Sequence, residues 1–169
     1  PVGGIECKFF LGRREPIAGE EDVVTLWVDD GYNHLPAKGL AFYQYALEHY
    51  DFDWLFKCDD DTYLALDRLE SLCDDRYDLV GDMSLANRGF PSGGAGYLMS
   101  RALVEQIVAH GDQVPATGAE DVDLGAVAGE GLQHAEEEQG VVGLLLRRRR
   151  RTGRRSRPRC APSRPARAR

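Results

Sequence analysis

Residues 53–63 read D-W-L-F-K-C-D-D-D-T-Y, an apolar run that stops at three consecutive carboxylates. The run from Trp54 to Cys58 is nearly all apolar, which is typical of a central strand covered on both faces. Three adjacent like charges at the end of a buried strand are costly unless a cation lies among them. A divalent metal would supply that cation, since Mg²⁺ and Mn²⁺ prefer oxygen ligands. A solvated acidic turn is the alternative interpretation.

Strand and helix patterns alternate on both sides of this stretch. Strand patterns cover residues 5–11, 22–28, 54–58, 78–81 and 93–99, and helix patterns cover 35–50, 67–72, 100–110 and 120–128. Ser100 is suited to cap the third helix, and Asp67 with Glu70 has the spacing of a cap for the second. The alternation predicts an α/β layered domain with a largely parallel sheet, in which ligands bind beyond the carboxyl ends of the strands. The three carboxylates lie at one such end.

The charge of the chain is divided sharply along its length. The formal charge of −7 consists of −19 for residues 1–146 and +12 for residues 147–169, where arginine is the only charged residue type. We therefore expect a domain over residues 1–140 and a disordered Arg/Pro-rich tail over residues 141–169. Such a composition also arises when a GC-rich message is read out of frame, so a frame-shifted, non-native tail is favoured over an arm for nucleic acid or anionic membrane. No nucleic-acid partner is expected.

The chain begins at Pro1 without a basic-then-apolar leader, and no apolar run is long enough to span a bilayer. We expect it to be an interior piece of a longer chain, in which a membrane anchor is an open question. The four cysteines (Cys7, Cys58, Cys73 and Cys160) do not have the spacing of a zinc site. The cellular compartment is left open by these features.

Three further motifs accompany the acidic triplet, the name used here for Asp59, Asp60 and Asp61. The four motifs in chain order are D-x-Y-x-x-L-x-x-K-x-L at residues 30–40, K-x-D-D-D at 57–61, G-G-x-G-Y at 93–97 and E-D-V-x-x-G at 120–125. Together they resemble the β1,3-glycosyltransferase superfamily, which includes the β1,3-galactosyltransferases and Fringe. The resemblance implies a GT-A-like (Rossmann-like) fold, incomplete in this chain. It also implies an inverting, metal-dependent hexosyltransferase.

The resemblance also implies the substrates and the roles of the acidic residues. The donor would be a UDP-sugar of galactose or N-acetylglucosamine type, the acceptor a hydroxyl of a glycan or glycoprotein, and the metal Mn²⁺ or Mg²⁺. Asp61 would be the main metal ligand, while Asp59 and Asp60 would reach the ribose, the sugar or metal-bound water. Asp121 would be the base that takes the acceptor proton, with Glu120 beside it. Adjacent helix positions point about 100° apart, so only one of the two can face the reacting centre.

Other residues of the motifs would contact substrate. Gly93, Gly94 and Gly96, followed by Tyr97, would let the backbone approach a sugar closely, although a tight turn accounts for the glycines equally well. Lys38 would approach a phosphate or pair with a carboxylate of this acidic domain. The carboxylates of Glu120 and Asp121 are also favoured at any helix N-terminus, whatever their chemistry.

The chain departs from the family pattern at both edges. The family's first strand should precede Ile5, and its metal-binding histidine is matched only by His134, 13 residues after Asp121. A catalytically incomplete remnant that binds a sugar or nucleotide is therefore an alternative function. A Mg²⁺-dependent phosphatase of haloacid-dehalogenase type is a weaker alternative, because that motif requires Thr or Val where Tyr63 stands.

Overall fold

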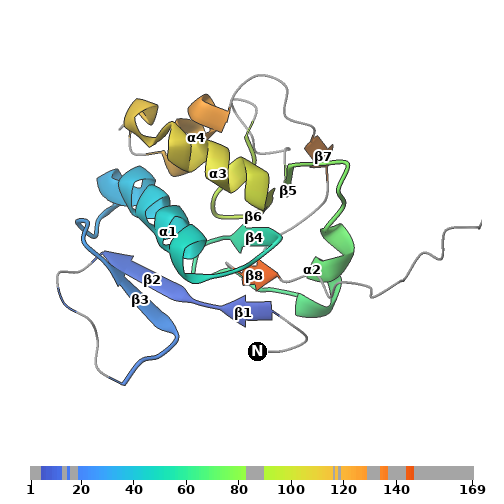
Figure 1. Cartoon of the computed structure of the whole chain (residues 1–169), viewed down its shortest axis with the longest axis horizontal. Coiled ribbons are helices and arrows are strands. Elements are labelled where there is room, and N and C mark those ends of the chain that lie inside the picture. The colour runs from blue at the N-terminus through green and yellow to red at the C-terminus, as the bar shows by residue number, and fades with distance from the viewer. Residues whose placement is uncertain are drawn as a thin grey trace, which may run out of the picture.

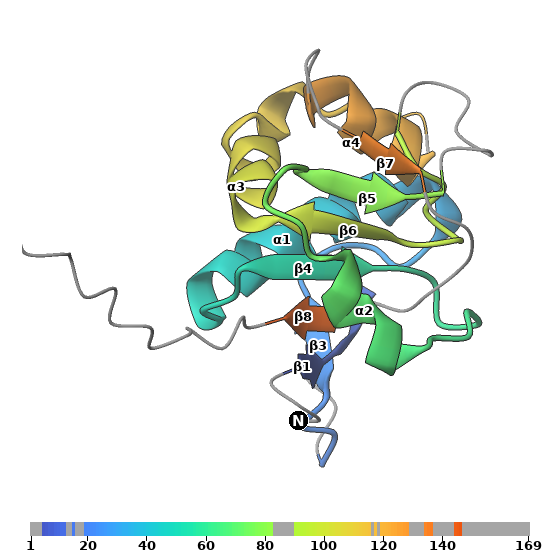
Figure 2. The ribbon, with the colours of Figure 1, turned by 90° about the vertical axis from the view of Figure 1, so that its right-hand side faces the viewer.

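A computed structural model describes residues 5–12, 15, 19–82, 90–115, 117 and 119–128, together with the backbone of residues 134–136 and 144–146. In chain order the elements are β1 (Ile5–Cys7), β2 (Phe9–Gly12), β3 (Val23–Leu26), η1 (Tyr32–His34), α1 (Leu35–His49), β4 (Trp54–Lys57), α2 (Leu66–Leu72), β5 (Leu79–Gly81), β6 (Tyr97–Ser100), α3 (Arg101–Ala109), η2 (Gly111–Gln113), α4 (Glu120–Ala128), β7 (His134–Glu136) and β8 (Leu144–Leu146). Helices α1, α3 and α4 lie on one side of the main sheet, and α2 lies on the other (Figures 1 and 2). The predicted α/β layered domain is confirmed, and it is consistent with an incomplete GT-A-like fold.

The main sheet has six strands in the order β1-β8-β4-β6-β5-β7. Within it only β5 and β7 pair in parallel, and the other pairings are antiparallel. The expectation of a largely parallel arrangement is therefore wrong for this sheet. The reason is that β6 begins at the edge where β5 ends, with Tyr97 opposite Gly81, so the chain reverses between them. A parallel pair requires a long crossover connection, usually a helix, and the described residues between these two strands, 82 and 90–96, contain no helix.

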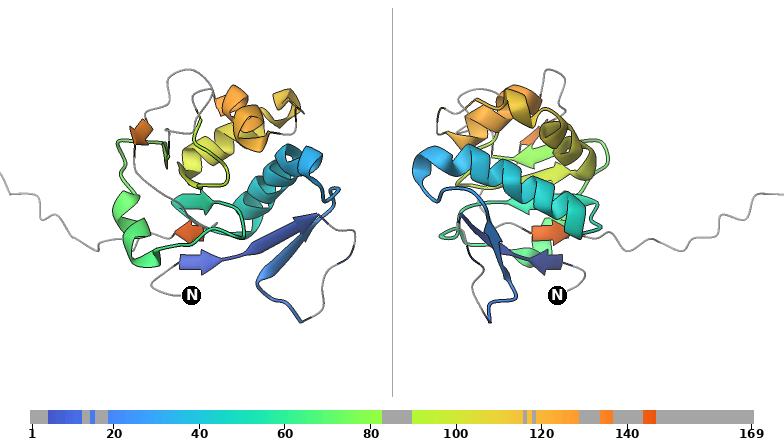
Figure 3. Two further views of the ribbon diagram at one scale, coloured as in Figure 1. Left: turned by 180° about the vertical axis from the view of Figure 1, so that it is seen from behind. Right: turned by 60° about the vertical axis from the view of Figure 1, so that its left-hand side comes forward.

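Strands β2 and β3 form a separate, parallel two-stranded sheet. This ribbon extends beside α1, as the two views in Figure 3 show. The rings of Phe10 in β2 and Phe42 in α1 stack with their centroids 4.2 Å apart. The single strand expected over residues 5–11 is thus divided, because β1 pairs in the main sheet while β2 turns to pair with β3.

Side chains of the central strand alternate between two cores. Trp54 and Phe56 pack on the α2 side, in the same cluster as Leu69 of α2. Leu55 packs on the other side, in the cluster that contains Tyr43 of α1. All four side chains of β4 are buried, as the apolar run predicts for a strand covered on both faces. Because successive side chains point to opposite faces, the next residue on the Leu55 side is Lys57.

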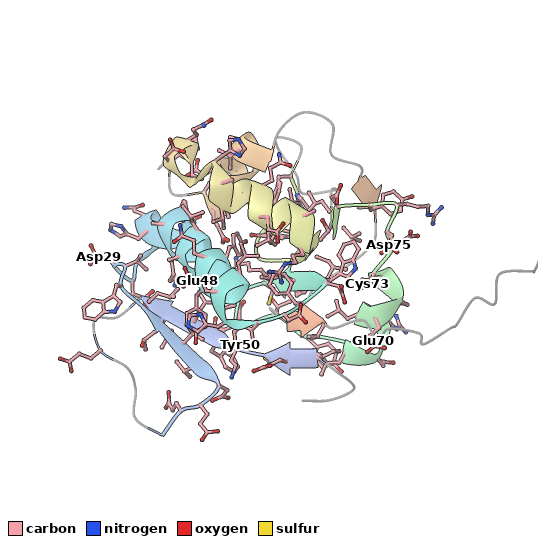
Figure 4. The ribbon with its side chains drawn as sticks, viewed as in Figure 1. Asp29, Glu48, Tyr50, Glu70, Cys73 and Asp75 are labelled. Atoms are coloured by element: carbon pink, nitrogen blue, oxygen red, sulfur yellow. The ribbon has the colours of Figure 1, made fainter. Side chains whose placement is uncertain are left out.

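The helix boundaries agree with most of the expected caps. Helix α1 has a proline in its first turn, and α3 begins after Ser100, whose hydroxyl accepts the Leu103 N–H at 3.2 Å. The cap expected from Asp67 is wrong, since α2 begins one residue earlier and Ala65 occupies the cap position without a side-chain hydrogen bond. Asp67 lies in the first turn instead, where its charge favours the helix dipole. Figure 4 marks the end of α1 by Glu48 and Tyr50, and α2 by Glu70 and Cys73.

Strand β8 lies inside the sheet, between β1 and β4. Its backbone pairs antiparallel with both neighbours, with Leu146 opposite Ile5 on one side and Trp54 on the other. The domain boundary expected near residue 140 stays a prediction, and the paired residues 144–146 belong to the segment that charge composition assigns to the tail. A short leucine segment can pair as a strand whatever charge follows it. The arginine-rich remainder lies outside the described residues.

Within the described residues, the helices are too short or too polar to cross a membrane.

Candidate active site

A cleft of about 330 Å³ lies at the end of β4, where the acidic triplet begins. One wall is apolar and comes from Phe9, Phe10 and Leu11 of β2. The other groups that line it are mainly charged, and they include Lys38, Lys57, the acidic triplet and Glu120. The structure therefore brings residues of three of the four sequence motifs into one cleft.

The acidic triplet forms an exposed turn at the mouth of this cleft. The Thr62 N–H donates to the Asp59 carbonyl at 3.4 Å, which closes the turn and leaves Asp60 and Asp61 at its centre. All three carboxylates are exposed, as an acidic turn requires. The Thr62 hydroxyl donates to the Gly94 carbonyl at 2.9 Å, so the turn is also attached to the glycine-rich segment.

Lys57 is the centre of a buried polar network between β4 and α4. Its ammonium group donates to Glu120 Oε2 at 2.5 Å and to Asp59 Oδ1 at 3.3 Å. Lys57 and Glu120 are only 4% and 5% exposed, so their charges compensate one another inside the protein. Glu120 Oε1 accepts the Tyr97 hydroxyl at 2.9 Å, and that hydroxyl lies 2.7 Å from the hydroxyl of Tyr43. The network thus extends from the triplet to the buried face of α1.

The network shifts the titration of its members toward higher pH. Burial raises the pKa of Tyr43 and Tyr97 well above 10, and the negative charge of Glu120 raises both further. Burial acts to lower the pKa of Lys57, but the charge and hydrogen bond of Glu120 outweigh it, so that the pKa rises above 10.5. At neutral pH both tyrosines are therefore protonated and Lys57 is charged.

We expect the free energy of unfolding to fall as the pH rises above about 10. In the unfolded chain the two tyrosines and Lys57 lose their protons near their ordinary pKa values, whereas the folded protein holds them to higher pH. The folded state binds more protons in this range, so its stability decreases with pH. Tyr43→Phe removes one of these groups, and we expect the slope to become shallower by up to about 1.4 kcal/mol per pH unit. Urea unfolding at several alkaline pH values measures the slope, and an unchanged slope in Tyr43→Phe would contradict the assignment.

Asp121 opens helix α4 beside the network without joining it. Its Oδ2 accepts the Gly93 N–H at 3.2 Å, and its Oδ1 accepts the Val122 N–H at 2.8 Å. Asp121 is partly exposed, whereas its neighbour Glu120 is buried against Lys57. The two adjacent carboxylates therefore point into different surroundings, as their angular separation on a helix predicts.

The glycine-rich segment forms a tight turn before β6. The Gly96 N–H donates to the Ser92 carbonyl at 3.1 Å, and Gly96 has a φ of 93°, which favours glycine. Strand β6 begins at Tyr97, after the glycine-rich part of residues 93–99. For Gly96, the geometry therefore supports a tight turn. This turn places Gly93 and Gly94 between the acidic triplet and α4.

Gly96→Ala is expected to reduce the free energy of unfolding by about 1–2 kcal/mol, because an L-residue in this conformation brings its Cβ too close to the backbone. Gly31→Ala is the matched control. Gly31 has an extended backbone with a φ of −176°, and a Cβ there would meet only the His34 ring, at 3.7 Å. Urea unfolding of both variants checks the difference, and equal losses would show that backbone conformation is not the cause.

Comparison with known proteins follows the same motifs. Residues 14–87 match the protein family described as galactosyltransferase, a stretch that includes α1, β4 and the acidic triplet. The probable beta-1,3-galactosyltransferase 13 of Arabidopsis thaliana is 34% identical over 79 residues, which are 41% of this chain and 23% of that protein. The UDP-GalNAc:beta-1,3-N-acetylgalactosaminyltransferase 2 of Danio rerio is 27% identical over 126 residues. Residues 14–87 are thus similar to the galactosyltransferase family.

The similarity to this galactosyltransferase family covers more of the chain than of its relatives. The Danio rerio protein is matched over 62% of this chain but over 26% of its own length. The glycoprotein-N-acetylgalactosamine 3-beta-galactosyltransferase 1 of Xenopus laevis is 32% identical over 114 residues, which are 60% of this chain and 31% of that protein. The chain thus spans between a quarter and a third of the length of these two curated relatives.

Two further predicted site residues are Lys38 and His134. Lys38 lines the cleft, but its ammonium group pairs with Asp30 Oδ1 at 2.8 Å, which is the carboxylate pairing that the sequence left open. His134 begins β7, opposite Leu79 of β5. Strand β7 lies three strands from β4, roughly 14 Å away at the usual spacing between strands. The side chain of His134 lies outside the described part of the chain, so its metal-binding role stays a prediction.

Sequence reasoning missed three residues that organise the site. Lys57 was used only to match the K-x-D-D-D motif. A lysine at the end of a buried apolar strand needs a carboxylate partner, and in the structure this partner is Glu120. Thr62 and Tyr43 carried no signal, because their hydroxyls find partners distant in sequence. Only the folded chain shows these contacts.

Proposed function

We propose that the protein is a metal-dependent hexosyltransferase that transfers galactose, or an N-acetylhexosamine, from a UDP-sugar to a hydroxyl of a glycan or glycoprotein with inversion. Similarity to the galactosyltransferase family supports the transfer reaction. The observation that carries the proposal is the cleft itself, because the acidic triplet and Glu120 line it together, and Asp121 follows Glu120 at the start of α4. An exposed acidic turn elsewhere on the surface would not support it.

The chemistry of the acidic triplet fits a hard divalent cation such as Mn²⁺ or Mg²⁺. Three exposed carboxylates supply oxygen ligands, and Asp61 has no hydrogen bond to a cation among the described residues, whereas Asp59 is shared with Lys57. The described residues contain no group of three or more His, Cys, Asp or Glu placed to hold a metal ion. Asp61 and Asp60 would therefore hold the metal together with substrate phosphates and water, as is usual for Mg²⁺. When bound, the metal would neutralise the charge that develops on the leaving diphosphate.

The contacts favour Asp121 over Glu120 as the base. The charge of Glu120 is already compensated by Lys57, and its second oxygen accepts the Tyr97 hydroxyl. A proton transferred to Glu120 would leave Lys57 as an uncompensated buried charge. Asp121 is partly exposed, and it accepts hydrogen bonds from two backbone N–H groups. It can therefore take the proton of an acceptor hydroxyl without disrupting the buried pair.

Calorimetry of the 169-residue chain with UDP in the presence and absence of Mn²⁺ tests the proposed function. We expect binding that requires Mn²⁺ and is lost in Asp61→Asn. Release of UDP from UDP-galactose, UDP-N-acetylgalactosamine and UDP-N-acetylglucosamine, each with a glycan acceptor, then identifies the donor. The absence of both Mn²⁺-dependent binding and UDP release would overturn the proposal. If the protein instead hydrolyses a generic phosphate ester, and Asp59→Ala abolishes that activity, the protein is a phosphatase.

A further inference from the structure

Two separate connections join the acidic triplet to the N-terminus of α4. The first is Lys57, whose ammonium group contacts Asp59 of the triplet at 3.3 Å and Glu120 of α4 at 2.5 Å. The lysine charge therefore connects Asp59, which is half exposed at the mouth of the cleft, with Glu120, which is buried. A lysine with one partner would hold only one side of the cleft.

The second connection passes through the backbone of the glycine-rich turn. The Thr62 hydroxyl, next to the triplet, donates to the Gly94 carbonyl at 2.9 Å. The neighbouring Gly93 N–H donates to Asp121 Oδ2 at 3.2 Å. One peptide segment is therefore held by the triplet turn on one side and by α4 on the other.

The two connections lie side by side and leave little free space between them. A Cβ placed on Gly93 would lie 3.6 Å from the Lys57 ammonium group and 3.8 Å from Glu120 Oε2. A Cβ placed on Gly94 would lie 3.3 Å from Asp59 Oδ2. The turn is thus packed against the ion pair, so that displacement of one connection displaces the other.

We propose that Thr62 and Lys57 are positioning residues that tie the acidic triplet to Asp121, so that a ligand bound at the triplet fixes the orientation of α4. The identity of that ligand as a metal-bound nucleoside diphosphate rests on the proposed function. The coupling rests only on the four contacts above and exists in the ligand-free protein. Binding at the acidic triplet and the base at the start of α4 would then form a single unit.

Amide hydrogen exchange at Gly93 in the ligand-free protein tests the coupling. Thr62→Val keeps the shape of the side chain but removes its hydroxyl. The lost hydrogen bond is to the Gly94 carbonyl, so the substitution does not directly remove the hydrogen bond of the Gly93 N–H. We expect exchange at Gly93 to become about three- to ten-fold faster, because the turn loses the contact that holds it against Asp121. Ser71→Ala is the matched control, since it removes a hydroxyl bond to the Arg68 carbonyl in α2, away from the cleft. An unchanged rate at Gly93 in Thr62→Val would overturn the proposal.

Lys57 variants and measurements with added UDP and Mn²⁺ distinguish failure of the coupling from failure of the proposed function. Lys57→Arg retains the charge, and we expect it to keep Gly93 exchange closer to the wild-type rate than Lys57→Met does. UDP with Mn²⁺ should slow Gly93 exchange in the wild type and should do so less in Thr62→Val. If Thr62→Val accelerates exchange but UDP with Mn²⁺ has no effect on the wild type, the coupling stands and the proposed function fails. If the ligand binds but Gly93 responds equally in both proteins, the coupling fails alone.

Discussion

Asp121→Asn is expected to slow sugar transfer by a factor of about 10² to 10⁴ and to leave Mn²⁺-dependent binding of UDP intact. Asparagine retains an oxygen that can accept the Gly93 N–H, so the turn keeps its contact with α4. It has no carboxylate, so it cannot take the proton of the acceptor hydroxyl. Because the acidic triplet is unchanged, only the rate of transfer and not the affinity for the nucleotide should respond.

Steady-state kinetics and calorimetry on the same preparations distinguish this role from a structural one. Asp112→Asn is the matched control, because Asp112 is an exposed carboxylate in η2 that does not line the cleft. Asp61→Asn should show the opposite pattern, with loss of Mn²⁺-dependent binding. A full rate in Asp121→Asn together with a large loss in a stable Glu120→Gln protein would reverse the roles of the two adjacent carboxylates.

Lys57→Met is expected to lower the free energy of unfolding by about 3–5 kcal/mol, the usual cost of removing one partner from a buried ion pair. Methionine fills much of the space of the lysine stem, so packing around β4 changes little. Glu120, which is 5% exposed, would then carry a buried charge that no longer has the Lys57 ammonium group beside it, while it still accepts the Tyr97 hydroxyl. The loss therefore measures the uncompensated carboxylate rather than a cavity.

The double variant Lys57→Met/Glu120→Gln separates these two causes. Glutamine removes the charge but still accepts the Tyr97 hydroxyl, so the double variant should be more stable than Lys57→Met alone. Lys8→Met is the control, because Lys8 pairs with Glu6 at the surface and its loss should cost less than about 1 kcal/mol. Urea unfolding of the four proteins gives the comparison. A loss in Lys57→Met no larger than that in Lys8→Met would contradict a compensated buried pair.

Local sequence patterns predicted most of the elements correctly, because their physical causes are local. Helix α1 follows from apolar residues at helical spacing after an early proline, and α3 follows from the Ser100 cap. Strand β4 follows from a continuous apolar run. Strand direction was predicted less well, since the pairing of β6 with β4 and β5 depends on where the chain reverses rather than on the composition of any strand.

For the site, motif order predicted which segments meet but not how their charges are arranged. The triplet, the glycine turn and α4 lie together as expected, and Lys57 connects two of them. The predicted roles of Asp61 and Asp121 stay predictions. The boundary near residue 140 also stays a prediction, and composition does not indicate the pairing of β8 with β1 and β4, because that pairing depends on distant strands.

By itself, the sequence determined the α/β class, the buried character of β4, the exposed acidic turn after it and the similarity to the galactosyltransferase family. These depend on hydrophobic periodicity, on charge and on motif spacing, which are readable along the chain. Only the tertiary structure decided that Lys57 compensates Glu120, that Asp121 remains outside this pair, and that Thr62 joins the triplet to the glycine turn. The reason is that each of these contacts joins residues from different elements, and a buried charge or hydroxyl takes whichever partner the folded layers bring within reach.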